Sequence, residues 1–293
     1  MANIETLIAD IYEALEEGVD VNTIKNRDAL ENFGRSISSA LRRQLSEGTR
    51  HRASETPRVR MSQIGKPDRQ LWYEFNSTAE PEIISGQSKM RFLFGDMLEA
   101  LLILLAEVSG HEVTECQEEV TLEDIKGHKD CKIDGVLVDI KSASPYSFKK
   151  FKEGTLHSSD AFGYIAQISA YAEASGDKSA KFFAIDKSSG EMALMDVESV
   201  HMINASERIK KVKTMVNSDV VPPRCYEAEA DGTSGNMKLP VGCVFCPHKF
   251  ECWKTANNGQ GLKVFQYSNG FRFLTNVAKV PNVVEVTDTF TNG

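Results

Sequence analysis

A predicted hairpin around Asp134-Gly135 contains the residues with the clearest capacity for chemistry. Asp-Gly between β-prone residues is a two-residue turn signal. Counting outward from the turn places Asp130 opposite Asp139 and His128 opposite Lys141. Two opposed carboxylates repel, and a divalent cation reverses that penalty because hard cations take carboxylate oxygens as ligands. The hairpin therefore indicates either a cation site or a solvated face that tolerates two acids.

Alternation along the two strands separates a core face from a polar face. The predicted core face consists of Cys131, Ile133, Val136, Val138 and Ile140, with Lys129 at its outer end. The opposite face carries His128, Asp130, Asp139 and Lys141, with Lys132 and Leu137 nearer the turn. His128 is interpreted as a proton-relay group or as a purely structural residue.

Two further acids, Asp96 and Glu99, lie in a helix predicted from Met90 to Val108. That stretch is apolar nearly all round, which predicts burial, and the acids share one face at i, i+3. A buried carboxylate without a partner is costly. Each acid is therefore expected to have a polar partner, to point into a site, or to mark a helix edge that reaches solvent.

The composition limits the protein class. The chain has 293 residues, 41% of them apolar, and a net charge of −8. No signal peptide or membrane-length apolar run is apparent, so we expect a cytoplasmic protein. The negative net charge argues against a general nucleic-acid binder. Three basic clusters can nevertheless bind phosphates locally, or they can form solvated faces. They are Arg42, Arg43, Arg50, Arg52, Arg58 and Arg60; Lys149, Lys150 and Lys152; and Lys210, Lys211 and Lys213.

The elements that must position these residues alternate between helices and strands. Helices are predicted within residues 1–48, a polar linker over 48–57, and a strand near 112–120 before the hairpin. Further predictions are a helix over 160–173, strands over 180–186 and 191–197, a basic helix over about 199–215, and strand-like pieces at 262–267 and 271–275. This order is typical of an α/β layer.

The order of four motifs resembles that of the PD-(D/E)xK nuclease superfamily, in its RecB-like and lambda-exonuclease-like branches. The motifs are Gly95-x-x-x-Glu99, Gly127-x-x-Asp130, Asp139-x-Lys141 and Gln167-x-x-x-Tyr171. The resemblance covers about residues 61–253. It implies a restriction-endonuclease-like α/β core with a mixed central sheet flanked by helices.

The resemblance also implies the role of each residue. Glu99, Asp130, Asp139 and the Ile140 carbonyl would hold one or two Mg²⁺ or Mn²⁺ ions, Lys141 would orient or activate water, and Gln167 and Tyr171 would contact DNA or support the site. The implied activity is that of a metal-dependent DNA nuclease, an exonuclease of the phage recombination or DNA-degradation kind. A recombination or single-strand-binding protein is an implied partner.

Four cysteines near the C-terminal end form a second signature: Cys225, Cys243, Cys246 and Cys252. The Cys243-x-x-Cys246-x5-Cys252 spacing resembles the C-terminal cluster of iron–sulfur nucleases, which implies a structural [4Fe–4S] cluster. Lys66 stands where that family has its first cysteine, so Cys225 would be the fourth ligand, and structural zinc is the alternative. Cys116 and Cys131 are predicted to be core residues.

The predicted division has four stretches: N-terminal helices with a linker (1–60), the nuclease core (61–224), a cysteine metal knuckle (225–253) and a tail (254–293). Two other functions stay open. One is a non-catalytic nucleic-acid-binding or structural module with the same fold, and the other is a restriction-like endonuclease.

Overall fold

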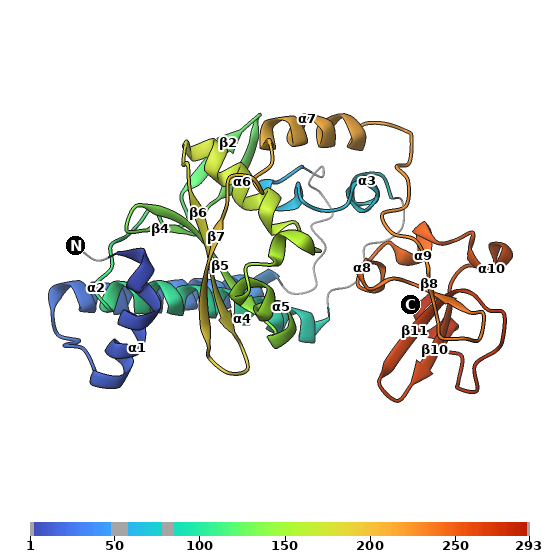
Figure 1. The fold of residues 1–293 in the computed structure, drawn as a ribbon, viewed down its shortest axis with the longest axis horizontal. Coiled ribbons are helices and arrows are strands. Elements are labelled where there is room, and N and C mark those ends of the chain that lie inside the picture. The colour runs from blue at the N-terminus through green and yellow to red at the C-terminus, as the bar shows by residue number, and fades with distance from the viewer. Residues whose placement is uncertain (1–2, 48–57, 78–84, 292–293) are drawn as a thin grey trace. The chain divides into compact units, whose positions relative to one another are not determined.

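The computed structural model describes residues 3–47, 58–77 and 85–291 and divides the chain into two compact units (Figure 1). The first unit comprises Met1–Gly65 and Ile83–Lys211, and the second comprises Lys66–Glu82 and Val212–Gly293. The linker predicted over 48–57 lies outside the described residues. The four-part division by role stays a prediction.

A five-stranded sheet forms the centre of the first unit. Its strands are β1 (Val113–Thr114), β4 (Cys131–Ile133), β5 (Val136–Ala143), β6 (Ala180–Asp186) and β7 (Met192–Val197), in the order β1-β4-β5-β6-β7. Strands β5 and β6 are parallel, whereas the other neighbours are antiparallel. The predicted mixed central sheet in an α/β unit is confirmed.

The β4–β5 hairpin turns where its sequence predicts. Asp134 and Gly135 have φ values of +49° and +80°, in the left-handed region that a type I′ turn requires. The register is also the predicted one, with Cys131 opposite Val138, Lys132 opposite Leu137 and Ile133 opposite Val136.

The predicted pairing of His128 with Lys141 is wrong. His128 ends β3 (Ile125–His128), which forms a separate two-stranded sheet with β2 (Glu119–Leu122) and places His128 opposite Glu119. The physical reason lies in residues 129–130, whose backbone groups bond to residues 117–118: Lys129 N donates to Glu118 O at 3.2 Å, and Gln117 N donates to Asp130 O at 3.0 Å.

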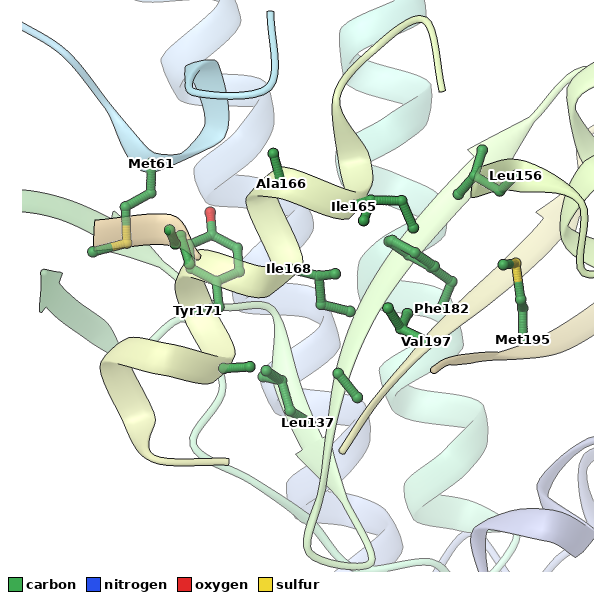
Figure 2. Packing of buried hydrophobic residues seen from close by; sticks show 14 of the residues in the cluster. Met61, Leu137, Leu156, Ile165, Ala166, Ile168, Tyr171, Phe182, Met195 and Val197 are labelled. Atoms are coloured by element: carbon green, nitrogen blue, oxygen red, sulfur yellow. The ribbon is translucent and has the colours of Figure 1, made fainter. Parts of the chain in front are cut away.

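Helices cover both faces of the central sheet. One face packs on α1 (Leu7–Glu17) and α4 (Gly86–Val108), where Cys131, Ile133, Val138 and Ile140 join Leu7, Ile11 and Leu102 in one apolar cluster. The other face packs on α5 (Pro145–Lys152) and α6 (Tyr164–Ser175). Figure 2 shows Ile165, Ile168 and Tyr171 of α6 over Leu137, Phe182 and Val197 of the strands.

The prediction that the whole of α4 is buried is wrong for its N-terminal half. Met90, Phe92, Phe94 and Met97 are between 38% and 53% exposed, whereas Leu102, Leu104 and Ala106 are buried. Only the second half of α4 therefore contributes to the core. Beside α4 runs α2 (Ile24–Glu47), which lies within the predicted helical region of residues 1–48.

The second unit combines a helix from early in the chain with the C-terminal residues. Its four-stranded sheet has the order β10-β11-β9-β8, formed by Lys263–Tyr267, Gly270–Asn276, Met237–Lys238 and Glu229–Ala230. Helix α3 (Asp68–Asn76) is bonded to this unit through Trp72 Nε1 to Ser218 O at 2.7 Å and Arg69 Nη1 to Pro222 O at 2.6 Å. The short helices α8 (Val241–Val244), α9 (Lys249–Cys252), α10 (Ala256–Gly259) and α11 (Thr287–Thr291) complete it.

Helix α7 (Ala205–Val216) contains the boundary between the two units, which falls after Lys211. Short 3₁₀ helices lie at Ile4–Thr6, Met61–Gln63 and Leu156–Ser158. Within the described part of the chain, no helix has the length and apolar character needed to cross a membrane.

Candidate active site

Strand β5 places Asp139 and Lys141 on one face of the sheet, two residues apart. Asp139 is 1% exposed and forms an ion pair with the Lys141 ammonium, which is itself 15% exposed. The intervening Ile140 points to the opposite face and belongs to the apolar cluster under α4. Alternation along β5 therefore separates the two charged groups from the core.

Asp130 lies just before β4 and is fixed against β5. Its Oδ2 accepts a hydrogen bond from the backbone amide of Ile140 at 2.7 Å, and its side chain is nearly buried. Burial, and then the neighbouring charge of Asp139, hold the pKa of Asp130 well above its usual range. Burial also raises the pKa of Asp139, against the lowering effect of Lys141. Two buried acids side by side are costly unless a cation compensates them.

Glu99 of α4 approaches the same group from another element. Its Oε1 accepts a hydrogen bond from Gln117 Nε2 at 2.6 Å. Burial raises the pKa of Glu99, and the nearby charge of Lys141 opposes that increase. Asp96, the other acid of the predicted pair, instead forms a 2.6 Å ion pair with Arg43. The structure thus brings Glu99, and not Asp96, into electrostatic contact with the hairpin.

Lys141 is a cation in this environment. Burial alone would lower its pKa, but the charges of Asp139 and Asp130 outweigh burial and raise it. Its Nζ lies 4.9 Å from the centre of the Tyr164 ring, a cation–π contact. An ammonium held in this way donates hydrogen bonds and supplies positive charge.

Gln167 and Tyr171 are one helical turn apart on α6. Gln167 Nε2 donates to the Tyr171 hydroxyl at 3.2 Å, and burial raises the pKa of Tyr171 to about 12. Tyr171 also explains the glycine of the Gly127-x-x-Asp130 motif. A Cβ at Gly127 would lie 2.7 Å from Tyr171 Cε1 and 2.9 Å from Met61, so a larger residue there would force one of these side chains to shift. Figure 2 shows Met61 and Tyr171 next to one another.

The buried acids have the donor atoms that a hard cation prefers. Neither carboxylate oxygen of Asp139 has a hydrogen-bond partner within the described residues, and Oδ2 has only the ion pair with Lys141. Such an unsatisfied buried oxygen fits a Mg²⁺ or Mn²⁺ ligand. In the part of the chain that is described, however, no three His, Cys, Asp or Glu side chains are arranged to hold a metal ion as they stand.

His128 does not join this group. Its side chain is 55% exposed, and its nearest charged neighbour is Glu119, at 3.9 Å. The proton-relay interpretation depended on the hairpin continuing to residue 128, which it does not. The purely structural interpretation of His128 is the better one.

The four C-terminal cysteines line one small cavity of about 20 Å³ in the second unit. The α3 segment reaches the same cavity, where Arg69 Nε donates to Cys252 Sγ at 3.1 Å. The cavity is therefore lined from α3 by Pro67, Arg69, Gln70 and Tyr73, whereas Lys66 forms a 2.7 Å ion pair with Glu74. The described cysteines do not form a metal-ligand group as they stand.

The two remaining cysteines differ from each other. Cys131 is buried in the core, as predicted, whereas Cys116 is exposed, so its prediction is wrong. Cys116 lies between Glu115 and Gln117, which both have positive φ, in an irregular segment where period-two alternation does not apply.

The basic clusters are partly engaged by nearby acids. Lys152 lies 2.5 Å from Glu191, Lys149 lies 3.6 Å from Glu153, and Lys210 lies 3.1 Å from Glu123. Exposed ion pairs of this kind contribute little free energy and exchange readily. Phosphate binding by these lysines stays a prediction.

Neither a protein-family model nor a curated protein sequence matches this chain. Two solved structures have partial likeness. The crystal structure of SSO0001 is 13% identical, with a TM-score of 0.40 over 72% of this chain and 93% of that one. LHK-Exo in complex with dAMP is 18% identical, with a TM-score of 0.31 over 53% of this chain and 86% of that one. Both TM-scores are below 0.5, so neither likeness establishes a shared fold or function.

Two residues of the site were not found from the sequence. Tyr164 lies three residues before Gln167 on α6, so the helical spacing 164, 167, 171 was a signal that could have found it. Gln117 lies in the irregular segment between β1 and β2, and no spacing rule connects it with Glu99.

Proposed function

We propose that this protein is a Mg²⁺- or Mn²⁺-dependent nuclease of the PD-(D/E)xK type that hydrolyses DNA, in the manner of an exonuclease. One observation supports this most. Asp130 and Asp139 are buried side by side, the Ile140 amide fixes one of them, and Lys141 lies against the other. A purely structural pair of buried acids would be destabilising, whereas a cation-binding pair is not.

Each side chain has a definite task in this proposal. Asp130, Asp139 and Glu99 would hold the divalent cation, which polarises a phosphate oxygen and makes water a better nucleophile. Lys141, a cation at neutral pH, would donate to a phosphate oxygen and oppose the negative charge that develops there. Tyr171 and Gln167 support the site from α6 through their mutual hydrogen bond and through Gly127.

The experiment compares cleavage of end-labelled linear DNA, circular DNA and single-stranded DNA, with Mg²⁺, with Mn²⁺ and with EDTA. Asp139→Asn and Lys141→Ala should each lower the rate at least about a hundredfold without loss of fold. Asp186→Asn is the matched control, because Asp186 is a buried acid on the next strand, β6. Wild-type rates in both site variants would reject the hairpin as the active site. A wild-type protein that cleaves none of these substrates with either metal would reject the function.

We also propose that Cys225, Cys243, Cys246 and Cys252 hold a structural metal. All four line one cavity, and thiolates are ligands for zinc and for iron–sulfur clusters. The Cys243-x-x-Cys246-x5-Cys252 spacing resembles that of iron–sulfur nucleases, and zinc is the alternative.

A further inference from the structure

Phe162, on the turn before α6, is an aromatic side chain that is 64% exposed. Its ring stacks on Tyr164, with the ring centres 5.5 Å apart and the planes 25° from parallel. The Lys141 ammonium also contacts the Tyr164 ring, 4.9 Å from its centre. One aromatic ring therefore connects an exposed phenylalanine with the lysine of the candidate active site.

Tyr164 is supported from the core. Its ring centre lies 6.3 Å from that of Phe151 and 6.4 Å from that of Phe182, and both of those residues are buried. These buried neighbours hold the Tyr164 ring in place. Phe162 is the exposed end of this series of aromatic rings.

The turn that presents Phe162 is fixed by its backbone. Asp160 Oδ1 accepts hydrogen bonds from Gly163 N at 2.9 Å and Tyr164 N at 3.0 Å, and its Oδ2 accepts one from Ile165 N at 2.8 Å. Gly163 has a φ of +76°, and a Cβ there would lie 2.4 Å from the backbone of Gly65. The position of the Phe162 ring is thus set in advance, so a ligand need not order it on binding.

We propose that Phe162 stacks on an unpaired nucleobase whose neighbouring phosphate lies at Lys141, so that the substrate is single-stranded where it enters the site. This inference rests on the nuclease function proposed above. Bases stack on aromatic rings without regard to sequence. Inside a duplex both faces of each base are already covered by its neighbours. A ring on a rigid turn beside the reacting phosphate therefore selects bases that have left the stack.

The test measures DNA binding separately from cleavage. Binding is followed by fluorescence anisotropy with labelled single-stranded and blunt duplex oligonucleotides in Mg²⁺, in an Asp139→Asn background. Phe162→Ala should weaken single-strand binding on the order of tenfold, as expected for the loss of one stacked base, and leave duplex binding unchanged. Phe162→Tyr keeps the ring and should bind like Phe162, whereas Phe162→Leu should resemble Phe162→Ala. Phe271→Ala, at a half-exposed phenylalanine of the second unit, is the matched control.

Cleavage by the otherwise wild-type variants gives the second readout. Phe162→Ala should raise KM for single-stranded DNA and change kcat much less, because Phe162 contacts the base and not the reacting atoms. Equal losses on single strands and blunt duplex would mean that Phe162 reads a terminal base pair, which overturns the inference. The inference is also overturned if the wild-type protein cleaves DNA and the Phe162→Ala variant has the same single-strand affinity and the same KM as the wild type. If the wild type binds single strands through Phe162 but cleaves nothing, the proposed nuclease function fails and the stacking site stands.

Discussion

The backbone amide of Ile140 donates a 2.7 Å hydrogen bond to the Oδ2 of Asp130. This bond joins the residue before β4 to the centre of β5, one peptide from Asp139 on one side and from Lys141 on the other. It holds a carboxylate beside a second carboxylate that repels it. The metal-free site is therefore expected to be destabilising, and this can be measured.

Metal-free stability should depend on pH through Asp130. Burial and the charge of Asp139 raise the pKa of Asp130 in the folded protein above the value of about 4 in the unfolded chain. The folded state thus binds the proton more tightly. The carboxyl's contribution to stability is complete below the unfolded pKa and is lost as pH rises through the folded pKa.

We expect the melting temperature of the protein in EDTA to fall as pH rises from about 4 through the raised folded pKa of Asp130. Asp130→Asn should flatten that fall and make the metal-free protein more stable at neutral pH, since the amide oxygen still accepts from Ile140. Mg²⁺ should stabilise the wild type more than this variant. A wild-type and a variant profile with the same slope would show that Asp130 does not titrate as inferred.

Glu99 and Gln117 should set metal affinity together. Glu99→Gln removes a ligand charge and should raise the Mn²⁺ concentration for half-maximal cleavage strongly, with activity returning at high Mn²⁺. Gln117→Ala removes only the hydrogen bond that orients Glu99 and should raise it about tenfold, at the lower end of effects for such supporting residues. Asp96→Asn, on the same helix but paired with Arg43, should leave the metal dependence unchanged. An equal effect of Asp96→Asn and Glu99→Gln would contradict this assignment.

The cysteine cavity should contain metal. Cys246→Ser should lower metal content and unfolding temperature together, because metal binding at such sites is coupled to folding. Cys116→Ser, at an exposed cysteine of the first unit, should change neither. Brown anaerobic protein indicates an iron–sulfur cluster, and colourless protein with one bound zinc indicates the alternative. Four free thiols without metal would reject the site.

Lys129 should be sensitive to the loss of its partners. Its side chain is 2% exposed and forms ion pairs with Glu115 and, at 2.7 Å, with Glu118. Replacing both glutamates with glutamine leaves a buried ammonium uncompensated. We expect this to lower the free energy of unfolding by about 3 kcal/mol. Lys129→Met should cost less, because both glutamates reach water. Chemical denaturation of the two variants measures the difference, and the reverse order would contradict it.

The features that were predictable from the sequence were set locally. Asp134-Gly135 determines its own turn and hence the pairing of β4 with β5, and alternation then separates Asp139 and Lys141 from Ile140. The prediction that paired His128 with Lys141 failed because it depended on backbone hydrogen bonds to residues outside the hairpin. Lys129 is bonded to Glu118 and Asp130 to Gln117, so the hairpin ends before His128 reaches Lys141. No local pattern marks that departure.

The same distinction applies to the site. Asp130 and Asp139 were predicted from the register of the hairpin, Glu99 from an acid that interrupts an apolar helix, and all three from the order of the motifs. Gln117 was missed because it lies in an irregular segment, where no helical or strand spacing relates it to Glu99. The exposed half of α4 was missed for another reason. Apolar composition predicts burial, but only Leu102 and its neighbours meet the sheet.

Helix α3 has a consequence for how the chain is synthesised. Its Trp72 and Arg69, and the C-cap residue Ser77, bond to Ser218, Pro222 and Glu251, which are translated 146, 153 and 174 residues later. The last strand of the central sheet ends at Val197. The sheet can therefore leave the ribosome and fold before the partners of α3 have been synthesised. Because the chain enters the second unit twice, a truncation after Lys211 keeps the whole first unit together with α3, and no single truncation releases the second unit whole. A nascent chain stalled before Val212 would therefore hold α3 without the partners that it has in the folded protein.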